Sequence, residues 1–185
     1  VDVLLRAGYR VVSFDAPAHG RSPGRRTDVF EIVQALQAVA HRFGPFHGVI
    51  AHSLGVLSCS IAMADGVIEP PRVVCLAPAV TQDPLIAHFA TTLGIPEPVL
   101  PHFRERLHGF AGPDFWNRAE ISVPALLIHD RDDHLIPYSQ SEGLRMRWPT
   151  AELHTTQQLG HFGILRAPEV IERAVTHLGS APGTT

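Results

Sequence analysis

The chain has 185 residues, of which 45% are hydrophobic, and its 15 Lys and Arg residues against 18 Asp and Glu residues give a formal net charge of -3. This length and apolar content suit a single domain with a sizeable core, and the scattered basic residues exclude a basic face for nucleic acid. There is no apolar run of membrane-spanning length, and the first residues lack the layout of a signal peptide, so the sequence predicts a soluble, cytoplasmic protein.

The two cysteines favour the same compartment. Cys59 and Cys75 lie in apolar runs without Cys-x-x-Cys spacing, which is typical of buried free thiols in a reducing cytoplasm. A single disulfide between them is the alternative.

The first part of the chain alternates between helical and strand patterns. Residues 1–8 are expected to form the last turns of an amphipathic helix that stops at Gly8, and "YRVVSF" is typical of a buried parallel strand. A loop rich in glycine and proline follows, and then Thr27 or Asp28 can cap a helix that extends to Phe43. Further elements are expected as strands over residues 47–51 and 72–77 and a helix over residues 54–64.

The second part returns to the same alternation after an irregular segment. Residues 79–123, rich in proline and aromatic side chains, are predicted to be an insertion that folds as a cap, with helical pieces near residues 84–93 and 97–107. Strands over residues 124–130 and 151–156 and helices over residues 139–147 and 168–178 follow. Alternating strands and helices indicate an α/β fold with a mostly parallel sheet flanked by helices, as one domain over residues 1–185.

Three polar residues come just after predicted strands. They are Ser53, Asp133 and His161, in that chain order. In an open α/β sheet, ligands bind outside the carboxyl ends of the strands, so these positions are the first candidates for a site. Serine, then acid, then histidine is the order found in α/β-hydrolases.

Four segments carry a family resemblance. "DAPAHGRSPG" is similar to an Asp-x-Pro-Gly-His-Gly-x-Ser loop, and "AHSLG" to the Gly-x-Ser-x-Gly nucleophile elbow. "IHDRDDHLIP" is similar to a His-Gly-x-x-Asp-x-x-Val-Pro segment, and "LGHFG" to a Gly-His segment. Each is weak alone, but four in the right order make the chain resemble the α/β-hydrolase superfamily of serine hydrolases and esterases over nearly its whole length.

The resemblance implies a catalytic triad. Ser53 would be the nucleophile, because a serine hydroxyl needs an adjacent base to take its proton, and His161 would be that base. Asp133 would hold the tautomer of His161 and stabilise the imidazolium. Neither a cofactor nor a metal is implied, and the scattered histidines show no metal-ligand spacing.

The resemblance also implies a nucleophile elbow. The tight turn between strand and helix demands small neighbours, which Ala51 and Gly55 supply, although Ala51 stands where the family usually has glycine. His52 is expected to pack beside the elbow. The backbone N–H of Leu54, at a helix N-terminus, would point at the position where an oxyanion forms.

Structural alternatives exist for each member of the triad. Ser53 can be an ordinary cap of the following helix, Asp132 competes with Asp133 for the role of the acid, and His161 can be a surface histidine. Two nearby polar residues are expected to be structural only, in a turn at Asp130 and in a loop at His19.

One part of the family pattern is missing from the sequence. The family has an earlier strand and a His-Gly loop whose backbone N–H is the second oxyanion donor. That strand would lie between residues 9–14 and 47–51, which must otherwise pair directly or leave a gap with unpaired backbone. The expectation is an N-terminally truncated α/β-hydrolase that lacks its early strands.

The predicted function is a serine hydrolase that cleaves a carboxylic ester or related acyl bond of a small molecule through an acyl-enzyme. Thioesterase, peptidase, acyltransferase and cofactor-free haloperoxidase activities are compatible with the same residues. The alternative from another class is a non-catalytic remnant or binding protein on the same scaffold, inactive through loss of the oxyanion loop.

Overall fold

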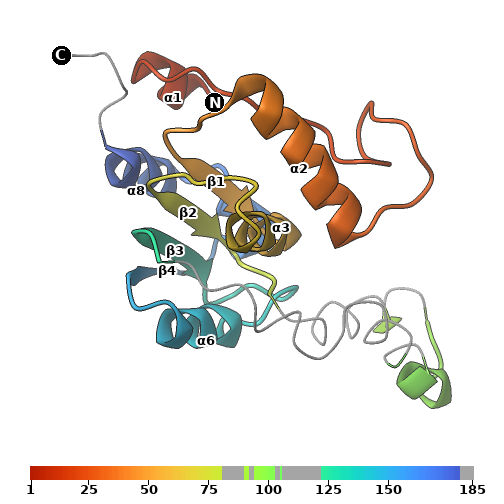
Figure 1. Ribbon diagram of the computed structural model, residues 1–185. Helices are drawn as coiled ribbons and strands as arrows, with labels where there is room; N and C mark the ends of the chain where they lie inside the picture. The colour runs from red at the N-terminus through yellow and green to blue at the C-terminus, as the bar shows by residue number, and fades with distance from the viewer. Residues whose placement is uncertain (81–89, 92–93, 103–104, 106–121, 180–185) are drawn as a thin grey trace.

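The computed structural model describes residues 1–80, 90–91, 94–102, 105 and 122–179, and a four-stranded parallel sheet lies at its centre (Figure 1). The strands follow the order β1-β2-β3-β4 and each pairs in parallel with the next. Their bounds are β1 Val49–His52, β2 Val73–Leu76, β3 Ala125–Asp130 and β4 Ala151–Thr156. The predicted α/β class with a parallel sheet is confirmed.

Most predicted helices form within a residue or two of their expected ends. They are α1 (Asp2–Arg6), α2 (Val29–Phe43), α3 (Leu54–Ala64), α6 (Ser139–Arg147) and α8 (Pro168–Leu178). Asp28 is the residue that caps α2, because its carboxylate accepts a hydrogen bond from the Glu31 N–H at 2.9 Å. A short helix that the sequence did not predict, α7 (Gly160–Gly163), carries His161.

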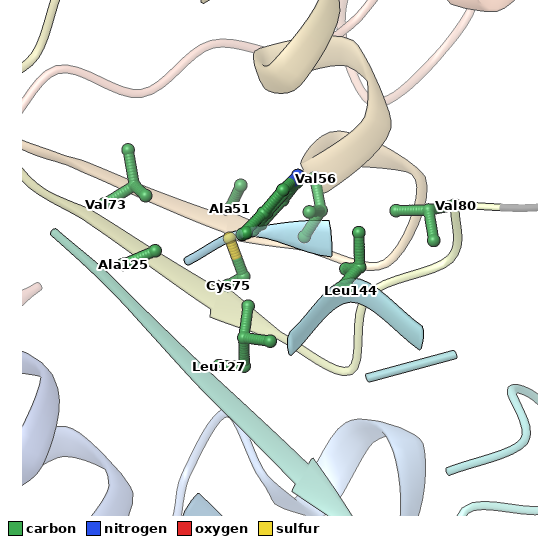
Figure 2. Packing of buried hydrophobic residues seen from close by; sticks show 9 residues of the cluster. Ala51, Val56, Val73, Cys75, Val80, Ala125, Leu127 and Leu144 are labelled. Atoms are coloured by element: carbon green, nitrogen blue, oxygen red, sulfur yellow. The ribbon is translucent and has the colours of Figure 1, made fainter. Parts of the chain in front are cut away.

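Side chains of the central strands alternate between two covered faces. Val73 and Cys75 of β2 pack on the face covered by α3 and α6 (Figure 2), and Val74 and Leu76 pack on the opposite face against α8. Burial on both faces explains why these strands read as continuous apolar runs. The result is a rigid sheet whose carboxyl ends hold the candidate site.

The predicted strand over residues 9–14 is wrong. These residues belong to no strand, and β1 is the edge of the sheet as far as the structure describes it. A groove of about 580 Å³ lies between this segment and β1. Residues 9–13 line it on one side, and Gly48 and Ile50 line it on the other. A strand exists only where a neighbour satisfies its backbone, so this apolar segment, separated from β1 by the groove, stays outside the sheet. Of the two arrangements expected in the absence of an interposed strand, direct pairing or a gap, the structure has the gap.

Both cysteines are free thiols next to the core. Cys75 is buried and Cys59 packs against the same cluster, and burial raises the pKa of the Cys59 thiol to about 12. The predicted free thiols are confirmed.

No helix in the described ranges has the length and apolar character needed to cross a membrane.

The predicted cap over residues 79–123 lies largely outside the described residues. Within it, the structure describes a short 3-10 helix, η1 (Glu97–Val99), at the start of the second expected helical piece. The helical piece near residues 84–93 is also outside the described ranges for most of its length. The cap remains a prediction.

Candidate active site

Ser53 occupies a strained turn between β1 and α3. Its φ of 55° and ψ of −126° lie outside the regions that a non-glycine residue ordinarily adopts. The turn is anchored because the Ser53 N–H donates to the Leu76 carbonyl at 3.0 Å and its own carbonyl accepts from the Val56 N–H at 3.0 Å. Its hydroxyl makes no capping bond to α3, so the capping alternative does not describe this serine.

The residues around the turn match the expected elbow only in part. Ala51 is buried in the core cluster behind the turn, where a larger side chain would displace its neighbours. A Cβ added at Gly55, by contrast, meets no atom of the described residues within 4 Å. The crowding expected at Gly55 is therefore not observed, and the elbow is tight on the Ala51 side.

His161 lies within hydrogen-bonding distance of Ser53. It comes from the first turn of α7, is buried, and places its Nε2 at 3.0 Å from the Ser53 Oγ. Its Nδ1 is 2.7 Å from Asp133 Oδ2. A carboxylate only accepts, so Nδ1 carries the proton and Nε2 is left to accept from the serine hydroxyl. This is the tautomer that a general base requires.

Asp133 is held by four contacts. Its Oδ1 accepts from the backbone N–H groups of Leu135 at 2.8 Å and Ile136 at 2.9 Å, and its Oδ2 faces His161 and a second imidazole, His129, at 3.3 Å. Burial by itself raises the pKa of a carboxyl, but the hydrogen bonds from these imidazoles and N–H groups hold the pKa of Asp133 well below its usual range. The carboxylate is ionised at neutral pH.

Asp132 points elsewhere. Its Oδ2 accepts from the Gln158 N–H at 2.8 Å, on the loop that leads to α7. Of the two competing carboxylates, the structure brings Asp133 to His161 and gives Asp132 a loop contact.

His52, which the sequence analysis expected beside the elbow, packs against the candidate base. Its ring centroid is 4.6 Å from that of His161, and its Nε2 donates to the His161 backbone carbonyl at 2.9 Å. Burial, with the nearby His161 ring, lowers the pKa of His52, although the bond to the carbonyl opposes the shift. A neutral His52 therefore holds the backbone of His161, the residue whose ring faces Ser53.

Asp130 has a larger role than the turn residue expected from the sequence. Its side chain has no exposed surface; Oδ2 accepts from Thr156 Oγ1 at 2.8 Å and from the Leu159 N–H at 3.1 Å, and Oδ1 accepts from the Asp132 N–H at 3.0 Å. This carboxylate ties the end of β3 to the loop that carries His161. The sequence signal was an ionisable pair, His129 and Asp130, at the end of an apolar strand.

Acidification below about pH 4 is expected to destabilise the fold through Asp130. Burial opposes its charge, but the hydrogen bonds from Thr156 and from backbone N–H groups lower the pKa of Asp130 below the ~3.9 of an unfolded chain. Its stabilising contribution is therefore complete above that value and is lost as the pH falls through the range below it. Thermal unfolding followed by circular dichroism from pH 7 to pH 3 measures the loss.

The matched variants are Asp130→Asn and Asp132→Asn. We expect Asp130→Asn to cost about 2–3 kcal/mol at pH 7, because an amide group then faces three donors, and to flatten the decline at acid pH. Asp132→Asn, on the exposed loop, is expected to cost less than about 1 kcal/mol. A pH dependence that stays the same in Asp130→Asn would contradict this account.

Two smaller expectations concern Leu54 and His19. Leu54 is the first residue of α3, so its N–H has no carbonyl one turn earlier in the helix and is available to an oxyanion. His19 places Nδ1 3.0 Å from the Pro17 carbonyl, a contact within its own loop.

Within the described ranges, no three His, Cys, Asp or Glu side chains are grouped to hold a metal ion.

Two curated relatives match most of this chain. It is 28% identical over 227 aligned residues to a 2-hydroxy-6-oxononadienedioate/2-hydroxy-6-oxononatrienedioate hydrolase of Burkholderia vietnamiensis, covering 95% of this chain and 78% of that protein. It is 24% identical over 214 residues to Protein ABHD8 of Mus musculus, covering 92% of this chain and 49% of that protein, so it spans about half the length of that relative.

Solved structures of low sequence identity share the fold. Monoacylglycerol lipase of Paleococcus ferrophilus matches with a TM-score of 0.67 at 22% identity, over 95% of this chain and 87% of that one. Esterase Pf2001 of Pyrococcus furiosus matches with a TM-score of 0.68 at 23% identity, over 95% of this chain and 70% of that one.

The family follows from the match along the chain together with the fold. A family model described as "Alpha/beta hydrolase family" matches residues 1–174, a range that includes the sheet, the elbow and the residues around His161. The predicted class, a hydrolase, is confirmed at the level of the family: the chain belongs to the Alpha/beta hydrolase family.

Proposed function

We propose that the chain is a serine hydrolase that cleaves a carboxylic ester or related acyl bond of a small molecule. The observation that carries the proposal is the hydrogen-bonded series from Ser53 Oγ to His161 Nε2, at 3.0 Å, and from His161 Nδ1 to Asp133 Oδ2, at 2.7 Å. Its members come from three separate segments of the chain, and the serine backbone is strained at the same point. Such strain clusters at functional sites, and a helix cap requires none of it.

The first half of the reaction forms the acyl-enzyme. Ser53 Oγ attacks the carbonyl carbon as its proton moves to His161 Nε2, and the charge that forms on His161 is stabilised by Asp133. The carbonyl oxygen becomes an oxyanion that accepts a hydrogen bond from the Leu54 N–H, strengthened by the N-terminus of α3. As the intermediate collapses, the alkoxide leaves with the proton from Nε2.

The second half releases the acid. Water gives a proton to His161 Nε2 as it attacks the acyl carbon, and collapse of the second oxyanion returns that proton to Ser53 Oγ. The acyl group leaves as a carboxylic acid, and the three side chains regain their starting states. No cofactor takes part in these steps.

The comparisons support the substrate class in outline. The Burkholderia relative is named a hydrolase, and the two solved structures are named a lipase and an esterase. For this chain we propose the same broad class, a small-molecule ester or acyl compound. The predicted cap, residues 79–123, is proposed to shape an apolar acyl or alcohol pocket through its aromatic side chains.

A fluorophosphonate probe tests the proposal, because it phosphonylates a serine only when a base activates that serine. We expect the folded chain to be labelled, with the added mass on the peptide that contains Ser53, and we expect Ser53→Ala to remain unlabelled. Ser60→Ala is the matched control, since Ser60 is a buried serine of the helix that follows Ser53, and its partners among the described residues are carbonyls of that helix. It should be labelled like the wild type.

Two outcomes contradict the proposal. Labelling that survives Ser53→Ala means that another nucleophile reacts. A folded protein that no probe labels means that the scaffold is non-catalytic, which is the alternative from another class.

A further inference from the structure

His129 is a buried histidine whose two ring nitrogens both have partners. It is the fifth residue of β3 and has no exposed surface. Its Nδ1 lies 2.7 Å from Ser141 Oγ on α6, and its Nε2 lies 3.1 Å from the Ile136 carbonyl oxygen and 3.3 Å from Asp133 Oδ2. The triad described above does not use this residue.

The proton on His129 can be assigned from its partners. A backbone carbonyl and an ionised carboxylate both only accept hydrogen bonds, so Nε2 carries a proton and shares it between them. In the neutral ring, Nδ1 is then an acceptor, and Ser141 Oγ donates to it. The two acceptors at Nε2 therefore set the tautomer that presents a donor to Asp133, and the Ser141 hydroxyl, which can donate or accept, fits that tautomer and holds the ring in place.

The two imidazoles meet at one carboxylate oxygen. Asp133 Oδ1 is fixed by two backbone N–H groups, whereas Oδ2 has His129 and His161 as its partners among the residues that the structure describes. Without His129, His161 would be the remaining partner of Oδ2, and the two backbone bonds to Oδ1 would alone hold the carboxylate from its other side. His161 is itself the residue that Oδ2 orients in the proposed reaction, and it gains a proton during that reaction.

We propose that His129, locked by Ser141, is a positioning residue that holds Asp133 Oδ2 against His161. The inference rests on the proposed function, because it concerns the residue that orients the base of that reaction. Among the described residues, the polar contacts of His129 go to Ser141, Ile136 and Asp133 and not to Ser53, so it would act through Asp133. The structure thus extends the series to Ser141–His129–Asp133–His161–Ser53.

The contact also affects the charge that faces His161. A donor on Oδ2 draws negative charge away from the side of the carboxylate that stabilises the imidazolium. Among the described residues, the other titratable or charged groups next to these are His52, whose ring lies against His161, and Tyr138, whose ring centroid is 5.7 Å from that of His129 and which carries the Arg131 guanidinium over its ring at 4.7 Å. Loss of the His129 donor should leave more charge facing His161 and favour its protonated form.

Two variants of His129 separate the contact to Asp133 from the contact to Ser141. The glutamine amide nitrogen is as many bonds from Cβ as histidine Nε2 is, so His129→Gln keeps a donor toward Asp133. The asparagine amide nitrogen matches Nδ1, so His129→Asn keeps only a partner for Ser141. The two side chains are equally polar and neutral, which makes them matched controls for each other.

The expected result is a loss in kcat confined to the variant without the donor. For a short-chain p-nitrophenyl ester, His129→Asn should lower kcat by about 10- to 100-fold, the range expected for one hydrogen bond to a charged group. KM should change little, and the acidic limb of the kcat/KM profile should move to higher pH. His129→Gln should recover most of the activity and the original limb.

Tyr138→Phe controls for disturbance at the start of α6, because it removes the hydroxyl that bonds to Thr155 without touching Asp133. In Tyr138→Phe, the acidic limb of the kcat/KM profile should stay at the pH of the wild type. Equal losses in both His129 variants with an unmoved limb, or no loss in either, would overturn the inference.

A measurement without turnover separates this inference from the proposed function. The proton between His161 Nδ1 and Asp133 gives a downfield proton resonance if that bond is well aligned. It should shift or exchange faster in His129→Asn and persist in His129→Gln. If the wild type is not labelled by the fluorophosphonate, the proposed function fails, and this resonance still decides whether His129 positions Asp133; an unchanged resonance in His129→Asn rejects it.

Discussion

Replacing His161 by alanine is expected to lower kcat/KM for a short-chain p-nitrophenyl ester by on the order of 10⁶-fold, the size of effect found when a triad loses its base. The variant leaves Ser53 Oγ without the acceptor that lies 3.0 Å away in the structure. A serine hydroxyl is then a poor nucleophile at neutral pH. The measurement is initial-rate kinetics at pH 7 to 8, with circular dichroism to show that the variant is folded.

His154→Gln is the matched control for this prediction. His154 lies on β4, where its electrostatic neighbours are Arg173 and Glu169 of α8, away from the elbow. We expect it to change kcat/KM by less than about threefold. If His161→Ala keeps wild-type activity, then His161 is not the base.

Replacing Asp133 by asparagine is expected to lower kcat by roughly 10⁴-fold, as happens in other triads when the carboxylate becomes an amide. The amide nitrogen is a donor, and facing His161 it would favour the tautomer with its proton on Nε2. That tautomer cannot accept the proton of Ser53. The loss should appear in kcat while the protein remains folded.

Asp132→Asn decides between the two adjacent carboxylates. Asp132 accepts from the Gln158 N–H and does not reach His161, so its replacement should change kcat by less than about threefold. A large loss in Asp132→Asn together with a small loss in Asp133→Asn would mean that the acid had been assigned to the wrong residue.

The secondary structure was predictable wherever residues close together in the sequence determine it. The helix over Leu54–Ala64 and the strand over Ala125–Asp130 have the predicted type and nearly the predicted ends, because periodicity, caps and turn residues act within a turn or two. The predicted strand ends likewise identify Ser53, Asp133 and His161 as candidate site residues. The side chains at those ends meet because parallel strands share one carboxyl edge.

The hydrogen-bond partners of individual side chains were predictable only where the family resemblance supplied them, because they depend on contacts between distant segments. For the two adjacent aspartates, the resemblance favoured Asp133 as the partner of His161, and the path of the loop does turn Asp133 toward His161; the contact of Asp132 with Gln158 had no signal in the sequence. Asp130 read as a turn residue until the structure placed Thr156 and Leu159 on its carboxylate. Burial of such a group is tolerated only when distant donors satisfy it.

The sequence by itself determined the α/β alternation, the family and the residue types on which the proposed reaction depends, since these reside in local patterns and in chain order. Only the tertiary structure decided that residues 9–14 stay out of the sheet and that His129, bonded to Ser141, contacts Asp133. The reason is physical. A strand needs a neighbour for its backbone hydrogen bonds, and a buried charge needs donors from elsewhere in the chain. The sequence does not show which distant segments meet these two requirements.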